Sequence, residues 1–270
     1  RQLLVYDALG FERPEFGHIS LILGKDKKKM SKRHGATSVD QYRQLGYLPH
    51  ALVNFLALLG WAPTDEKELF TTEELIQAFN MDHVAKNPAV FDIEKLNWIN
   101  AQYMRQLSDD DYIAMAIPHM KEAGYMTGTE TGEKLEWLKK VILTAKTQAE
   151  YGAQIPTHTA FYFSDDFDFE TEEAKAVLAE ETVPLVMNEF LTQLAAADIV
   201  DGPSVKAIFK GIQKGNKLKG QQVYMPVRVA LTGNQHGPEL VEMIPLLGKE
   251  RTKKRIMASL TKAGINLEGK

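Results

Sequence analysis

A run of basic residues between two glycines has the clearest chemical potential in this 270-residue chain. Residues 24–35 read Gly-Lys-Asp-Lys-Lys-Lys-Met-Ser-Lys-Arg-His-Gly, with six Lys and Arg side chains, directly after the apolar run 19–23. Lysine carries a compact ammonium on a flexible stem, so a loop of lysines can close over a polyphosphate. The glycines give the backbone the freedom that such a loop needs. The run predicts a phosphate clamp, with a solvated basic turn as the alternative.

The elements expected around this loop are a short strand and several helices. Residues 1–10 read as the end of an amphipathic helix, and residues 19–23 read as an apolar strand. Ser38 has the position of an N-cap for a helix over 38–46, and another helix follows over 49–59. This last helix has an apolar stripe that is predicted to be core: Leu52, Val53, Phe55, Leu56 and Leu59.

Helical patterns continue along the chain, and the predicted fold class is mainly α. Thr71 and Ser108 occupy N-cap positions before acidic residues, and periodic stretches cover 132–150 and 171–197. Segment 155–167 between them is aromatic and acidic. Because the spacing of its carboxylates matches no calcium loop, we interpret it as a solvated turn with buried aromatic residues, and we expect no metal site.

Composition sets broad limits on the class of protein. Hydrophobic residues make up 44% and charged residues 25%, as in an ordinary soluble protein. Cysteine is absent, which excludes disulfides and thiolate zinc sites and fits a cytosolic protein. No stretch approaches the roughly 20 apolar residues of a membrane span, and the first residues lack the pattern of a signal peptide. The missing initiator Met predicts that the chain is a piece of a longer one.

Charge is distributed unevenly along the chain, although the net charge is only -4. Residues 1–59 hold nine Lys and Arg against five Asp and Glu, and residues 60–201 hold ten against 27. Residues 202–270 hold thirteen against four. Two basic ends separated by an acidic middle can present phosphate-binding faces while the middle keeps the protein soluble. A chance asymmetry is the alternative.

The basic loop and the strand before it together carry a family resemblance. Residues 16–24 read Phe-Gly-His-Ile-Ser-Leu-Ile-Leu-Gly and lead into Lys-Met-Ser-Lys-Arg-His-Gly-Ala at 29–36. This string resembles the second ATP-binding signature of class I aminoacyl-tRNA synthetases, in the form found in bacterial-type glutamyl-tRNA synthetases. The first signature, His-Ile-Gly-His, is not present at His18. We therefore interpret His18 as structural and expect the first signature upstream of this chain.

The resemblance assigns roles to residues of the loop. It implies that Lys32 contacts ATP, with Lys29 and Arg33 as supporting charges and Ser31 as a hydroxyl donor. Lys29 and Lys32 are then the catalytic candidates, because they would stabilise charge on the phosphate oxygens while glutamate attacks the α-phosphate.

Two further strings extend the resemblance over nearly the whole chain. Residues 91–98, Phe-Asp-Ile-Glu-Lys-Leu-Asn-Trp, resemble the stem-contact fold that follows the ATP loop. Asn97, Trp98 and Asn100 are candidates for backbone or RNA contacts there, although Trp98 on a helical face favours core.

The string from 224 to 240 resembles the C-terminal anticodon-binding domain of bacterial glutamyl-tRNA synthetases, and a basic amphipathic helix beginning at 204 precedes it. Arg228 and Gln235 are candidates for holding a base, with a structural role for Arg228 left open. We expect the last helix to contact the RNA backbone through five residues: Lys249, Arg251, Lys253, Lys254 and Arg255.

The resemblance implies four parts. The end of a catalytic domain with the ATP loop covers 1–37, and a stem-contact domain covers 38–107. Two helical subdomains of an anticodon-binding cage cover 108–175 and 176–270. The glutaminyl relatives use β-barrels at this end, and the long helical periods here argue against them.

The activity implied is that of a parent enzyme that joins glutamate to tRNA(Glu) with ATP and Mg²⁺ in the cytoplasm, without zinc. This chain would bind tRNA but need the upstream catalytic half for chemistry. Whether tRNA(Gln) is also a substrate stays open, as does the oligomeric state. Two alternatives are a stand-alone tRNA-binding module derived from a synthetase and a helical scaffold with no RNA partner.

Overall fold

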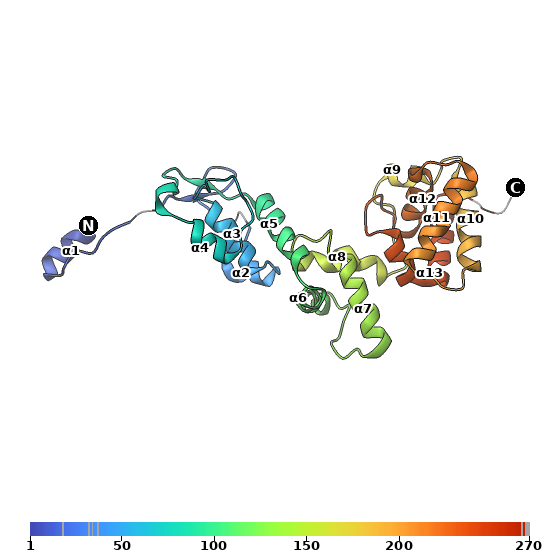
Figure 1. The fold of residues 1–270 in the computed structure, drawn as a ribbon, viewed down its shortest axis with the longest axis horizontal. Coiled ribbons are helices and arrows are strands. Elements are labelled where there is room, and N and C mark those ends of the chain that lie inside the picture. Colours follow the sequence, from blue (N-terminus) through green and yellow to red (C-terminus); the bar gives the residue numbers. More distant parts are fainter. Residues whose placement is uncertain (18, 32, 34, 37, 266, 268–270) are drawn as a thin grey trace. The chain divides into compact units, whose positions relative to one another are not determined.

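The computed structural model covers residues 1–270 and describes all of them except 18, 32, 34, 37, 266 and 268–270. The chain forms two units, residues 1–100 and 101–270, and the border between them lies inside one helix. Figure 1 labels the elements. Those that begin in the first unit are α1 (Gln2–Leu9), β1 (Ile22–Leu23), α2 (Val39–Gln44), α3 (Pro49–Leu58), α4 (Thr72–Ala78), β2 (Ala89–Val90) and α5 (Ile93–Gln106).

In the second unit, the regular elements formed by the described residues are all helices. Its helices are α6 (Asp109–Glu122), α7 (Gly132–Thr144), α8 (Ile155–Thr159), α9 (Glu172–Val177), α10 (Val183–Ala196), α11 (Gly202–Asn216), α12 (Gly220–Thr232) and α13 (Leu240–Lys262). Together with the first unit this confirms the mainly α fold class.

In the first unit a small parallel strand pair brings distant segments together. Ile22 in β1 pairs with Ala89 in β2, and Leu23 pairs with Val90. Next to this pair, the rings of Phe55 and Phe91 meet edge to face at 4.9 Å between centroids. A short aromatic contact of this kind adds to the free energy gained from burial. The strand pair fixes the start of the basic loop, because that loop leaves directly from β1.

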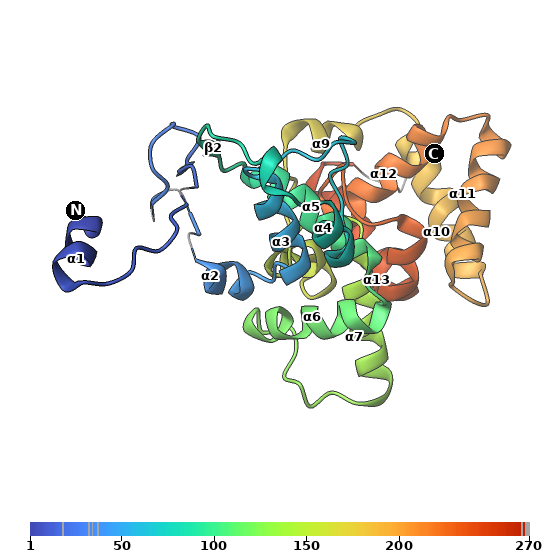
Figure 2. The ribbon, with the colours of Figure 1, turned by 60° about the vertical axis from the view of Figure 1, so that its left-hand side comes forward.

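The second unit has its main core among α10, α11, α12 and α13, which contact one another (Figures 1 and 2). Phe209 of α11 stacks between Phe190 of α10, at 5.2 Å, and Tyr224 of α12, at 4.4 Å. Phe190 and Phe209 are fully buried. The apolar face of each helix is thereby covered by its neighbours, which leaves the polar faces of α11 and α13 for solvent or a partner.

Helix starts follow the sequence closely. Ser38 accepts a hydrogen bond from the backbone N–H of Gln41, and Thr71 accepts one from Glu74, each as half of a capping box. Ser108 caps α6 in the same way through Asp111. These three predictions are confirmed, since a cap depends on side chains only three residues apart.

Several expectations about the elements are wrong in extent. The strand expected over 19–23 contains only Ile22 and Leu23, and the helical stretch expected over 171–197 is two helices, α9 and α10. Segment 155–167, expected as a solvated turn, begins with helix α8 and a 3₁₀ turn. The stripe on α3 is only partly core, because Val53 is 51% exposed and Leu56 is 42% exposed.

Candidate nucleotide and nucleic-acid interfaces

The basic loop is anchored at its base by backbone hydrogen bonds. The N–H of Gly24 donates to the carbonyl of Lys28 at 2.9 Å, and the N–H of Met30 donates to Ile22 at 3.2 Å. Lys27 has a φ of 59°, in the left-handed region that lets the chain reverse within a few residues. The N–H of Lys28 donates to the carboxylate of Asp26 at 3.0 Å, which closes the tip. The loop is therefore a short hairpin on β1 that carries lysines outward.

The lysines of this hairpin differ in whether a carboxylate lies within ion-pair distance. Lys25 donates to Glu94 of α5 at 2.7 Å, and this hydrogen bond raises its pKa and uses its charge. Lys27, Lys28, Lys29 and Arg33 are exposed, and no carboxylate among the described residues lies within ion-pair distance of them. Exposed cations on a held backbone suit a polyphosphate, which supplies several negative charges in a short length.

Three of the four sequence candidates in the loop are described. Lys29 and Arg33 are exposed, and Ser31 is half-buried. Lys32 and also His18 lie outside the described residues, so their expected roles stay predictions.

On α5 the asparagine candidates are used inside the protein. The side-chain oxygen of Asn97 accepts from the hydroxyl of Tyr47 at 2.5 Å, and that of fully buried Asn100 accepts from the N–H of Leu48 at 2.8 Å. Both tie α5 to the start of α3. Trp98, which the helical face placed in the core, is 42% exposed. The exposed aromatic ring is the one side chain of the three that is open to a partner.

Arg255 of α13 is buried, which contradicts its expected role as an RNA contact. Its side chain is fully enclosed and donates to Asp165 at 3.0 Å and to the carbonyl of Leu231 at 3.2 Å. It also donates to the carbonyls of Phe161 and Ser164. A buried guanidinium persists only when its donors are satisfied. Arg255 therefore holds segment 161–165 against α12 and α13.

Two more of the five cations that were expected to contact the RNA backbone bind groups of the protein. Arg251 donates to Asp165 and to the carbonyl of Tyr162 at 2.6 Å, and Lys249 donates to the carbonyls of Ala195 and Ala197. Their hydrogen bonds join α13 to neighbouring segments, and we do not retain them as RNA contacts.

The remaining two cations of that group face outward. Lys253 is exposed, and Lys254 is 72% exposed with its Nζ 3.6 Å from a carboxylate oxygen of Asp165. A long, exposed ion pair of this kind is weak. Lys253 and Lys254 therefore stay candidates for contact with a phosphate backbone.

The two candidates for base contact lie in different settings. Arg228 of α12 donates to the carbonyl of Pro238 at 2.7 Å, and burial lowers its pKa, so the structural role left open by the sequence is the one observed. This bond holds the loop 233–239 against α12. Gln235 on that loop is half-buried and lines a cavity of about 270 Å³ with Lys219, Gln221, Gln222 and Met225 among its neighbours.

A lysine series on α11 and its C-terminal end was missing from the sequence candidates. Lys206, Lys210, Lys214, Lys217 and Lys219 are all exposed, and none has a carboxylate partner among the described residues. The signal was present in the sequence as a basic amphipathic helix. The cluster of Lys and Arg at 249–255 is denser and therefore drew the prediction of RNA contacts. The sequence does not show which of those cations bind groups of the protein itself.

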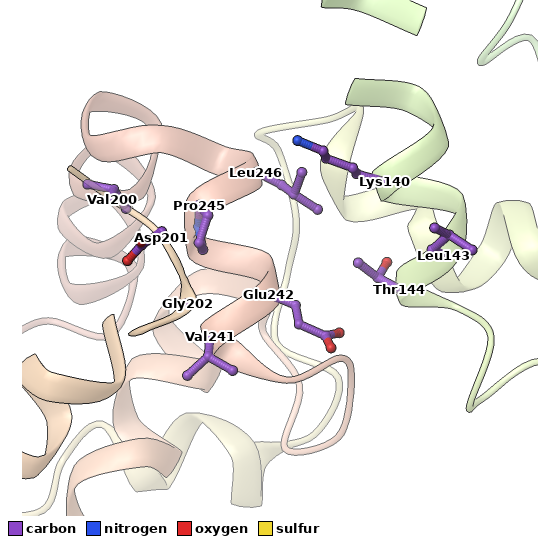
Figure 3. A pocket seen from close by; sticks show the side chains of 10 residues that line it. All are labelled: Lys140, Leu143, Thr144, Val200, Asp201, Gly202, Val241, Glu242, Pro245 and Leu246. Carbon is purple, nitrogen blue, oxygen red and sulfur yellow. The ribbon is translucent and has the colours of Figure 1, made fainter. Parts of the chain in front are cut away.

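Cavities in the second unit offer polar groups of several kinds. One, of about 570 Å³, has Lys140 and Thr144 of α7 on one wall and Glu242 and Leu246 of α13 on the facing wall (Figure 3). Another, of about 330 Å³, is lined by groups that include His158, Asn234 and His236. Burial lowers the pKa of His158, so this imidazole is neutral at pH 7.

Among the described residues, no three His, Asp or Glu side chains are grouped to hold a metal ion. None of the helices formed by these residues is long and apolar enough to cross a membrane.

Comparison with known families covers most of the chain. Residues 1–98 match the family described as "tRNA synthetases class I (E and Q), catalytic domain". Residues 105–260 match the family described as "Anticodon binding domain".

Individual relatives agree with these families. A glutamate–tRNA ligase of Desulforamulus reducens is 50% identical over 260 residues, which are 96% of this chain and 54% of that protein. One of Heliobacterium modesticaldum is 48% identical over 267 residues, with 99% of this chain and 54% of that protein covered. A crystal structure of a glutamate tRNA ligase from Elizabethkingia meningosepticum has a TM-score of 0.76 at 29% identity and covers 97% of this chain and 54% of that one.

The fold and both family matches define a class of protein, the class I aminoacyl-tRNA synthetases, whose E and Q branch supplies the first match. The chain belongs to the anticodon-binding-domain family within that class, and its curated relatives are glutamate–tRNA ligases. It spans about half the length of these relatives. The resemblance seen in the ATP-signature loop and in residues 224–240 is thus confirmed at the level of the family.

Proposed function

We propose that this chain is the tRNA-reading part of a glutamate–tRNA ligase and that it binds tRNA(Glu) without catalysing a reaction alone. The observation that carries the proposal is the order of the two family matches. A catalytic-domain segment that includes the basic loop is followed by an anticodon-binding domain over 105–260.

The parent activity in this proposal is the activation of glutamate by ATP and its transfer to tRNA(Glu). The exposed charges of Lys29 and Arg33, with Ser31 and Lys32 in the same loop, would hold the ATP phosphates. Magnesium would enter with ATP as its counter-ion. The loop would stabilise charge on phosphate oxygens and needs no covalent step from the protein.

The catalytic half of the same polypeptide is the expected partner within the protein, and tRNA(Glu) is the expected partner outside it. Pockets for glutamate and adenine would belong to that catalytic half. We place the protein in the cytoplasm, where aminoacylation supplies translation.

Binding of tRNA(Glu) to the purified chain tests the proposal. We expect the chain to bind tRNA(Glu) more tightly than an unrelated tRNA in fluorescence anisotropy, and to give no glutamate-dependent pyrophosphate exchange. Equal, weak binding to both RNAs would favour the helical scaffold without an RNA partner.

A test of whether the loop binds ATP requires the complete polypeptide. We expect Lys29→Gln to lower glutamate-dependent pyrophosphate exchange at least tenfold, because a lost charge contact in a transition state costs about 1.4 kcal/mol or more. Lys25→Gln is the matched control, since Lys25 is already paired with Glu94. An unchanged exchange rate in Lys29→Gln would contradict the role of Lys29 in holding the ATP phosphates.

A further inference from the structure

The cations of the C-terminal segment divide into two groups by their partners. On α13, Arg251 and Arg255 bind Asp165, and Lys262 lies 3.4 Å from Asp166 and 3.2 Å from Asp168. These charges therefore already have carboxylate partners within the protein. The five lysines from 206 to 219 are exposed and lack such partners among the described residues.

The lysines of α11 lie on one side of the helix. Lys206, Lys210 and Lys214 follow one another at intervals of four residues, so each step advances about 6 Å along the axis with only a small rotation. The opposite side is buried through Val205, Ile208, Phe209 and Ile212. The apolar face therefore fixes the helix on the bundle and fixes the direction in which the lysines point.

Acidic residues are absent from the sequence around this series. The chain has 36 Asp and Glu in 270 residues, yet none occurs between 202 and 238. A surface built only for solubility mixes both signs of charge. Two carboxylates lie near the series, Asp201 at the N-cap of α11 and Glu189, which accepts from Asn216, but neither forms an ion pair with its lysines among the described residues. A lysine series with so few carboxylates around it is complementary to a polyanion.

The last lysine of the series lines a cavity that also carries amide side chains. Lys217 ends α11 in the left-handed region, with a φ of 56°, and turns the chain toward Lys219 at the start of α12. Lys219 lines the cavity of about 270 Å³ together with Gln221 and Gln235, and the carboxylate of Glu180 also lies in its lining. Glutamine amides can pair with the edge of an unstacked base. Lys219 thus belongs both to the lysine series and to the lining of the amide cavity.

We propose that Lys206, Lys210, Lys214 and Lys217 form a track for the phosphodiester backbone of RNA, ending at the amide cavity beside Lys219. This rests on the proposed function, because it assigns the surface by which the anticodon-binding domain would hold its RNA. A backbone track positions RNA and carries no sequence information itself. The amide cavity is where a base would be read.

The salt dependence of tRNA(Glu) binding tests the track. Each phosphate contact contributes about 0.7 to 0.9 to the slope of log K against log salt concentration. We expect the triple variant Lys206→Gln, Lys210→Gln, Lys214→Gln to lower that slope by about two to three relative to the unmodified chain. The measurement is fluorescence anisotropy with labelled tRNA(Glu) between 50 and 200 mM salt, the range for which such slopes are usually compared.

A matched control separates a local track from general attraction. Lys86→Gln, Lys121→Gln, Lys140→Gln removes the same number of charges from exposed lysines on other elements. The slope of this control should stay within about one of the unmodified chain. Equal losses in both triple variants would overturn the track, with the proposed function intact. No binding of tRNA(Glu) by the unmodified chain would instead overturn the proposed function.

Circular dichroism shows whether the triple variant is still folded. The three α11 substitutions replace exposed residues with another good helix former, so the helical signal should be unchanged. A lowered slope in a folded triple variant supports the track.

Discussion

At the residue scale, the fate of each cation depends on what lies opposite it. Arg255 and Lys253 are two residues apart on α13, but Arg255 is fully enclosed and Lys253 is exposed. On a helix such a separation turns a side chain through about 200°, from the outer face to the core. One sequence cluster therefore holds both a structural guanidinium and a candidate RNA contact.

The carboxylate beside Arg255 gives a prediction about pH. Burial pushes the pKa of Asp165 upward, but hydrogen bonds from Arg251 and Arg255 outweigh it and lower the pKa below its usual value. A carboxyl group with a lowered folded pKa stabilises the fold above about pH 4, and that stability is lost as the pH falls through the folded pKa.

Asp165→Asn should therefore reduce the free energy of unfolding at pH 7 by about 2 kcal/mol, because the buried guanidinium loses its counter-charge. The difference from the unmodified chain should shrink between about pH 4 and pH 2. Urea unfolding followed by circular dichroism at pH 7, 4 and 2.5 measures both. A difference that is the same at all three pH values would contradict this account.

Gly233 gives a second prediction at this scale. It ends α12 with a φ of 74°, and a Cβ built on it would lie 2.3 Å from the carbonyl oxygen of Asp168. Gly233→Ala should lower the free energy of unfolding by more than 2 kcal/mol, from backbone strain plus this clash. Gly264, with a φ of 75° and open space around it, is the control.

Gly264→Ala should lower the free energy of unfolding by only about 1 kcal/mol, since it introduces backbone strain without a steric clash. Thermal unfolding of both variants gives the comparison. Equal costs would mean that the approach of Asp168 to Gly233 does not constrain the fold.

At this scale, some site residues could be predicted from the sequence and the roles of others could not. Lys29 and Arg33 could be chosen because a whole string surrounds them, and the structure leaves both exposed. The partners of Arg255 could not be predicted, since one of them, the carbonyl of Phe161, lies 94 residues away along the chain. Long-range pairing decides whether a guanidinium is structural, and a local pattern does not contain it.

At the element scale, helix starts could be predicted and helix lengths could not. A cap needs only local side chains, as in Thr71 with Glu74. The break between α9 and α10 at residues 178–182 has no glycine, and Pro184 comes one residue after α10 has begun. The position of that break depends on packing, because Leu178 and Val183 are both fully buried.

Capping also gives a prediction with an internal control. Thr71→Ala removes the hydrogen bond to the N–H of Glu74 and should lower the free energy of unfolding by about 1 kcal/mol. Thr131 stands at the N-cap of α7 without a side-chain cap bond, so Thr131→Ala should cost only a few tenths of a kcal/mol. Urea unfolding compares the two variants, and equal losses would argue against the cap at Thr71.

The apolar stripe of α3 shows a different limit of sequence patterns. Val53 and Leu56 belong to the stripe, yet they line an open apolar groove with Ile22, Phe79 and Met81. A periodic stripe predicts that a face is apolar, and the neighbouring elements decide how much of it is covered. For this reason the existence of α3 was predictable and its burial was not.

At the scale of the whole molecule, exposed lysines form two groups, one in each unit, that suit two different ligands. The basic loop in the first unit carries exposed lysines suited to a nucleotide, and the lysines of α11 in the second unit suit a long polyanion. The four-part division of the sequence stays a prediction. What the structure defines is two units with a border at residues 100 and 101.

The most direct test of the tRNA-reading role uses parts of the RNA. We would measure the binding of the purified chain to an isolated anticodon stem-loop of tRNA(Glu) and to an acceptor-stem minihelix of the same tRNA, by fluorescence anisotropy in one buffer. The account predicts that the stem-loop binds within about tenfold of the complete tRNA, a difference of about 1.4 kcal/mol, and that the minihelix binds much more weakly. Equal binding of the two pieces, or tighter binding of the minihelix, would contradict it.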